Sequence, residues 1–143
     1  MRLILVLLVV VVGACTAQDV AVSSGKARFS EYPDDLIAAF KAACEGPAQS
    51  FDEPAPGLFE CSEYLPPEPT AAIILNFDGT PEDLPVLVIR FRTTQEPESY
   101  LVENDVFLRI PQRDGKVLQV RSPDPELNRV LDQLYVLSGG VPA

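Results

Sequence analysis

The sequence predicts an α+β fold, in which an antiparallel sheet of about five strands carries two helices packed on one face. Two observations lead to this prediction. A helical segment comes first, a series of short strand-like segments follows, and a second helical segment ends the series. Strands that follow one another directly favour antiparallel pairing, and helices outside such a series pack together on one side of the sheet. Residues 31–143 are long enough for a single domain of this kind.

The first helix is expected to begin at Ser30 or at residues 33–35. Proline is favoured in the first turn of a helix, and the two acids that follow Pro33 stabilise the positive end of the helix dipole. Gly46 and Pro47 end the helix. Between these limits the apolar residues fall on one helical face, which consists of Leu36, Ile37, Phe40, Ala43 and Cys44.

Strand-like segments occupy most of the chain between residues 58 and 121, after a proline-rich loop at residues 46–57. Each segment alternates or is rich in apolar residues. Asp114-Gly115, between the last two segments, is a strong hairpin signal. The predicted strands are residues 58–65, 71–77, 85–93, 99–110 and 116–121.

The second helix is expected after residues 122–126, where Asp124 is suited to cap the helix and Pro125 to occupy its first position. Gly139-Gly140 ends it. Its buried stripe is predicted to be Leu127, Val130, Leu131 and Leu134.

The N-terminal residues have the order of an export signal. Arg2 supplies a positive charge, residues 3–12 form an apolar run, and small residues follow. The run is too short to span a bilayer, which takes roughly 20 apolar residues. The last four residues, Val12-Gly13-Ala14-Cys15, resemble the lipobox of bacterial lipoproteins.

This resemblance implies that residues 1–14 are removed and that Cys15 is lipidated, which anchors the chain to a membrane of the cell envelope. The domain would then lie in the periplasm or otherwise outside the inner membrane. Residues 16–30 hold little that could form a core and are predicted to be a flexible tether. The alternative is an ordinary secretory signal cut after Ala14 or Ala17.

Cys44 and Cys61 are predicted to form a disulfide. With Cys15 taken by lipid, they are the remaining thiols, and an exported protein matures in an oxidising compartment. The alternative is two separately buried thiols.

The composition is acidic, with 21 Asp and Glu residues against 11 Lys and Arg. Removal of Arg2 with the signal leaves 10 bases, so the mature chain carries about −11 at neutral pH. Nucleic acid is therefore not an expected partner, because phosphate backbones attract concentrated positive charge. The chain has no histidine, which excludes imidazole bases and histidine-ligated metals.

We predict no cofactor, metal or catalytic residue. The loop at residues 76–83 is faintly similar to a calcium loop, but Ile74 and Pro85 stand where that pattern requires acids. Paired carboxylates such as Glu60 with Glu63, or Glu82 with Asp83, are compatible with a small hydrolase. In so acidic a chain, most such pairs are expected to be solvated surface.

Basic residues concentrate late in the chain. The alternation of the predicted strands turns Leu87 and Phe91 toward the helices and four arginines with one phenylalanine to the opposite face. This candidate binding face consists of Arg90, Arg92, Phe107, Arg109 and Arg121. Its expected partner is an acidic protein surface or an anionic envelope polymer. In the alternative, these arginines are ordinary strand residues paired with acids such as Glu103 and Glu60.

The functional hypothesis is a small lipid-anchored envelope protein that acts as a non-catalytic binding or envelope-organising module. A lipid-anchored inhibitor or immunity-type protein is one alternative, and the small hydrolase is another. The sequence leaves the oligomeric state open.

Overall fold

The computed structural model describes residues 25–143, which form three helices and one seven-stranded sheet. The predicted α+β class is confirmed, with more strands than the five expected and one further helix. The helices are α1 (Asp34–Ala43), α2 (Pro67–Asn76) and α3 (Pro125–Leu137). The strands are β1 (Lys26–Phe29), β2 (Gln49–Ala55), β3 (Leu58–Tyr64), β4 (Val86–Gln95), β5 (Tyr100–Pro111), β6 (Val117–Val120) and β7 (Val141–Pro142).

Every pairing in the sheet is antiparallel, and the strand order is β2-β3-β4-β5-β1-β7. Strand β6 also pairs with β5. Because β4 occupies one edge of β5, both β1 and β6 lie along its other edge. Strand β1 pairs with Tyr100–Glu103 and β6 with Leu108–Pro111. The 12 residues of β5 therefore connect the two ends of the sheet.

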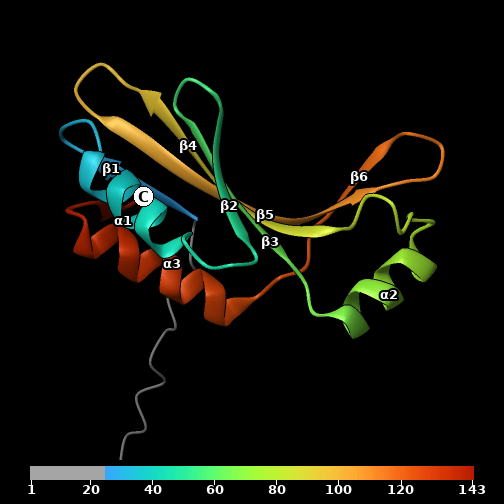
Figure 1. Cartoon of the computed structure of the whole chain (residues 1–143). Helices are drawn as coiled ribbons and strands as arrows, with labels where there is room; N and C mark the ends of the chain where they lie inside the picture. The colour runs from blue at the N-terminus through green and yellow to red at the C-terminus, as the bar shows by residue number, and fades with distance from the viewer. Residues whose placement is uncertain (1–24) are drawn as a thin grey trace, which may run out of the picture.

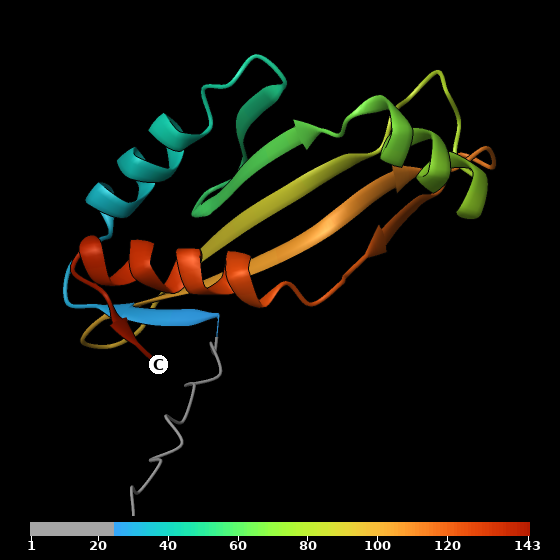
Figure 2. The same cartoon turned by 90° about the horizontal axis from the view of Figure 1, so that it is seen from below.

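All three helices lie on one side of the sheet, and the described residues place no helix on the other side (Figure 1). The view from below shows α3 and α2 in front of the strands (Figure 2). The sheet is bent, and both of its ends turn toward the helix-free side (Figure 1). The molecule thus has an apolar core on one face of the sheet and an uncovered second face.

The main core lies where α1 and α3 pack on the central strands. Phe91 of β4 makes edge contacts with Phe40 of α1, at 4.6 Å between ring centroids, and with Tyr135 of α3, at 5.5 Å. Burial raises the pKa of the Tyr135 hydroxyl, which accepts a hydrogen bond from Asn104. The whole cluster comprises Ala27, Phe29, Leu36, Phe40, Cys44, Phe59, Cys61, Phe91, Val102, Leu131 and Tyr135.

The predicted disulfide is present. Cys44 and Cys61 are bonded, with their Cα atoms 5.9 Å apart and a sequence separation of 17. The bond joins the end of α1 to β3. Closing a loop of this length contributes roughly 3 kcal/mol in the chain-entropy model.

Residues 71–77 were expected to be a strand, and that prediction is wrong, because they belong mostly to helix α2. Pro67 occupies the first turn of the helix, where a backbone N–H would have no partner within the helix, so the missing N–H of proline costs nothing. The Thr70 hydroxyl donates to the carbonyls of Leu65 and Pro66. The alanines that follow favour a helix, and these local signals prevail over the β-branched pair Ile73-Ile74.

The sheet also includes residues expected to lie outside it. Strand β1 begins within the predicted tether of residues 16–30, because Ala27 and Phe29 are buried in the core. Strand β2 lies within the predicted loop of residues 46–57 and contributes Phe51, which stacks on Phe59. The predicted domain start at residue 31 is therefore too late.

The two helix boundaries predicted from caps are close to those observed. Asp124 accepts hydrogen bonds from the backbone amides of Glu126 and Leu127, both at 3.0 Å, and caps α3 as predicted. Val130 departs from the predicted buried stripe, because half of its surface is exposed, whereas Tyr135 is fully buried.

The predicted lipidation site Cys15 and the predicted signal at residues 1–14 lie outside the described residues. Within residues 25–143, no helix is long and apolar enough to cross a bilayer.

Candidate binding face on the helix-free side of the sheet

The structure places the five residues of the predicted binding face on the helix-free side of the sheet. Ile89 and Phe91 pack toward the helices, so the alternating Arg90 and Arg92 project to the other side. In β5, Val106 packs toward the core, and Phe107 and Arg109 project with the arginines of β4. Arg121 follows β6 directly and meets them, because its guanidinium lies over the Phe107 ring.

Glu60 of β3 is the centre of an ion-pair network on this face. Arg90 donates to one carboxylate oxygen from Nε at 2.7 Å and Nη2 at 2.6 Å. Arg109 donates to the other oxygen from Nη2 at 2.6 Å. Only 6% of the Glu60 side chain is exposed. Burial raises the pKa of this carboxyl, but the hydrogen bonds from Arg109 and Arg90 outweigh it, so the pKa lies below its usual value.

Phe107 is buried to 1% exposure although no helix covers it. Three guanidinium groups lie over its ring, with their central carbons 4.7 Å (Arg90), 5.1 Å (Arg121) and 5.7 Å (Arg109) from the centroid. Cation–π attraction of this kind contributes about 0.5–1 kcal/mol at exposed sites and more where water is excluded. The arginine stems thus serve as the cover of an apolar residue.

Arg121 is also held by Asp105 of β5. Its Nε and Nη2 atoms donate to the two carboxylate oxygens at 2.8 and 2.6 Å, a two-point contact. The Arg121 hydrogen bonds lower the pKa of Asp105, and the charges of Arg90 and Arg92 add to this effect. Asp105 was not among the residues predicted for this face. Its position two residues before Phe107 on the same strand is a signal that could have identified it, because alternate residues of a strand share a face.

The structure decides in part between the two interpretations of the arginines. The alternative named Glu60 as a partner, and Glu60 does bind two of them. It also named Glu103, but Glu103 pairs with Lys26, at 2.8 Å. Arg90 and Arg109 thus share Glu60, Arg121 pairs with Asp105, and Arg92 lies directly opposite Glu103 in the strand register. Arg92 and Arg121 are exposed. The cluster keeps an excess of positive charge in a strongly acidic protein.

The paired carboxylates of the hydrolase alternative are not brought together. Glu60 and Glu63 are separated by three positions in β3, so they project from opposite faces. Glu82 and Asp83 are exposed, and a hydrogen bond from the Thr80 hydroxyl lowers the pKa of Glu82. Among residues 25–143 there is no group of three or more acids or cysteines arranged to hold a metal ion.

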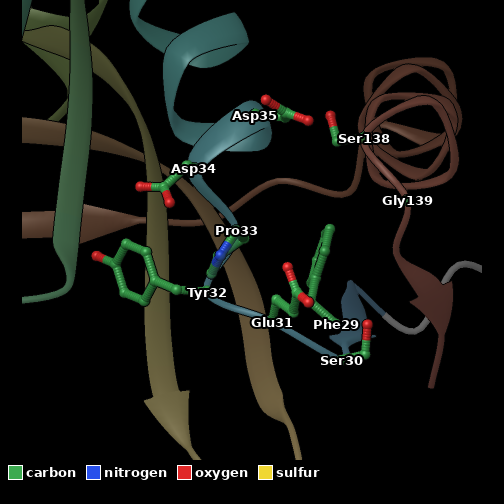
Figure 3. Close-up of a pocket in the computed structure, with 9 residues that line it drawn as sticks. All are labelled: Phe29, Ser30, Glu31, Tyr32, Pro33, Asp34, Asp35, Ser138 and Gly139. Atoms are coloured by element: carbon green, nitrogen blue, oxygen red, sulfur yellow. The ribbon is translucent and has the colours of Figure 1, made fainter.

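A separate pocket of about 370 Å³ lies at the start of α1 (Figure 3). Glu31, Asp34 and Asp35 line it together with Ser138 at the end of α3. Figure 3 shows Asp34 and Asp35 pointing in different directions, Asp35 toward Ser138 and Asp34 away from it. The acids therefore do not converge on a common point.

Comparison with known proteins gave no match: no protein-family model, no curated protein and no solved structure is significantly similar to this chain.

Proposed function

We propose that this chain is a lipid-anchored cell-envelope protein that binds an acidic partner through the helix-free face of its sheet. The observation that carries the proposal is the gathering of three guanidinium groups over Phe107, on a face where four arginines and Lys26 outnumber the carboxylates of Glu60, Asp105 and Glu103. The partner presents carboxylates or phosphates, on a protein surface or on an envelope polymer.

The ion pairs support this function by fixing the arginines in place. A flexible arginine loses side-chain entropy when it binds a ligand, whereas a guanidinium already held by Glu60 or Asp105 loses less. Each guanidinium has five N–H donors, and the contacts to the carboxylates use only some of them. The remaining donors of Arg109 and Arg121 can grip an incoming anion with their planar forks.

The exposed arginines give the cleaner test, because Arg90 and Arg109 also hold Glu60. We would measure binding of polyglutamate and polyphosphate to the wild type, to an Arg92→Ala, Arg121→Ala double variant, and to a Lys41→Ala, Lys116→Ala control. The control removes the same charge from α1 and from the β5–β6 hairpin. We expect about tenfold weaker binding in the arginine variant, near-wild-type binding in the control, and weakening by salt.

Equal losses in the two double variants would contradict the proposal, because they would show that only total charge matters. If the arginine variant binds polyglutamate and polyphosphate as tightly as the wild type does, the arginines of this face have a structural role and no role in binding.

The anchor is tested separately through Cys15. We expect Cys15→Ser to give an unprocessed or soluble protein, since only a thiol can carry the thioether lipid, and stable anchoring takes two or more acyl chains. Intact-mass analysis of the mature wild-type protein decides the matter. A mature chain that begins at Cys15 and carries no acyl mass would refute lipidation.

A further inference from the structure

An apolar groove crosses the helix-covered face of the sheet beside the start of α3. Two hollows form it, of about 320 and about 160 Å³, and Leu87 and Leu127 line both of them. Helices α3 and α2 lie over different ends of the sheet (Figure 2). Leu87, Leu108 and Val120 in the groove are only partly buried. The larger hollow alone reaches the roughly 300–1,000 Å³ of sites that receive ligands.

The floor of the groove is one row of side chains across four strands. Glu63 of β3 lies directly opposite Leu87 of β4. Leu108 continues the row in β5, and Val120 ends it in β6. Side chains directly opposite one another in antiparallel strands share a face. Because neighbouring strands lie about 4.8 Å apart, the row is about 14 Å long.

The wall of the groove at the β3 end is held by the disulfide. Cys44 at the end of α1 and Cys61 of β3 both line the smaller hollow, together with Phe40 and the buried Leu131. This covalent bond and the core packing fix the wall before any ligand arrives. A preformed site loses less conformational entropy on binding than one that must be ordered by its ligand.

Carboxylates mark both ends of the groove. Glu63 lines the smaller hollow and Asp124 the larger, and among the described residues that line the groove these two alone are charged. Glu63 accepts a hydrogen bond from the neutral amide of Gln49, and Asp124 accepts from two backbone amides. Within residues 25–143, neither carboxylate forms an ion pair with Lys or Arg.

We infer that this groove binds an extended peptide segment of another protein, in which two basic residues flank apolar ones. The first and last of five extended residues lie about 13 Å apart, which matches the length of the row. Basic side chains at the two ends pair with Glu63 and Asp124, and the apolar side chains between them cover Leu87 and Leu108. A fatty acid fits less well, because its carboxylate would meet a carboxylate at either end.

The first test compares peptides that are blocked at both termini. Full-length mature protein in vesicles of phosphatidylcholine, a lipid without net charge, is titrated with fluorescent Lys-Leu-Leu-Leu-Lys, and empty vesicles give the background. Gln-Leu-Leu-Leu-Gln removes the end charges, and Lys-Gly-Gly-Gly-Lys removes the apolar side chains. We expect each of these two to bind at least about tenfold more weakly. Equal binding of either one would overturn the inference, because the groove would then recognise only apolar surface or only charge.

The second test locates the site on the protein. Glu63→Gln with Asp124→Asn removes both carboxylates, and asparagine still caps α3. Glu98→Gln with Asp52→Asn is the matched control, since it removes the same charge from exposed positions in the β4–β5 turn and in β2. We expect about tenfold weaker binding of Lys-Leu-Leu-Leu-Lys in the groove variant and wild-type binding in the control.

Equal losses in the two double variants, or wild-type binding in the groove variant, would overturn the inference. The groove variant keeps all the arginines of the helix-free face, so its binding of polyglutamate should be that of the wild type. Failure of this inference is therefore distinguishable from failure of the proposed function.

Discussion

The two faces of the sheet bury phenylalanines by different means. On the helix-covered face, Phe91 is packed by the rings of Phe40 and Tyr135. On the helix-free face, Phe107 is equally buried beneath three arginine side chains. The first arrangement relies on close packing of rigid rings. The second relies on long charged side chains, which carboxylates hold in position. A sheet face without helices can therefore be ordered at its centre and still present charge to solvent.

The largest expected effect compares these two phenylalanines. Phe91→Ala should lower the free energy of unfolding by about 4 kcal/mol, because the aromatic core around it cannot collapse into the cavity. Phe107→Ala should cost less, about 2–3 kcal/mol, because arginine stems can fold into the vacated space. Urea denaturation of both variants measures the difference. Equal losses of unfolding free energy in the two variants would show that the arginine side chains over Phe107 are as rigid as the aromatic rings around Phe91.

Glu60→Gln should have the next largest effect. Removing one partner of a buried ion pair typically costs about 3–5 kcal/mol, and the partial exposure of both arginines places this variant near 3 kcal/mol or below. At the same time, the change removes the negative charge that competes with a polyanion for Arg90 and Arg109. We expect this gain to exceed the loss of their fixed orientation, so the affinity for polyanions should rise while stability falls. Calorimetry and polyglutamate titration check the two results. A parallel fall in stability and affinity would refute the binding role of these two arginines.

The contribution of the Glu60 ion pairs to the stability of the wild type should decrease at low pH. The pKa of Glu60 is lower in the folded state than its ordinary value of 4.5. The network therefore contributes fully above pH 4.5 and loses its contribution as pH falls through the folded-state pKa. We expect the stability difference between the wild type and Glu60→Gln to shrink steadily below this pH. A difference that stays constant down to about pH 3 would contradict the assignment.

The smallest effect is expected for Arg121→Ala. The pair with Asp105 is about half exposed at the arginine, and exposed ion pairs contribute about 0.2–1 kcal/mol. Thermal unfolding should therefore change by only a few degrees, although polyanion binding weakens. A loss of 2 kcal/mol or more would make Arg121 part of the core cover rather than a binding residue.

Periodicity and caps predicted much of this structure. The spacing of Leu36 and Phe40, and the cap at Asp124, identified α1 and α3, because each signal is local. The strand alternation placed Arg90 and Phe107 on one face. Helix α2 escaped prediction since its apolar run also suits a strand, and only the prolines and Thr70 distinguish the two.

Longer-range contacts account for the other differences. Ala27 and Phe29 alone do not suggest a strand, and their burial depends on β5, more than 70 residues away. The division of Glu60 between two arginines likewise depends on the register of three strands. Alternation can place a side chain on a face, but it does not specify which opposite charges meet there.

The position of β1 has a consequence for the order of folding. Strand β1 lies between β5 and β7, pairing with residues 100–103 and with 141–142. An early segment of the chain therefore pairs with two segments that are synthesised more than 70 and more than 110 residues later. Contacts of such sequence separation slow folding and delay it until the whole domain is available. A newly made chain therefore cannot complete this edge of the sheet until residues 141–142 are available, and such a delay is compatible with the export in unfolded form that we propose.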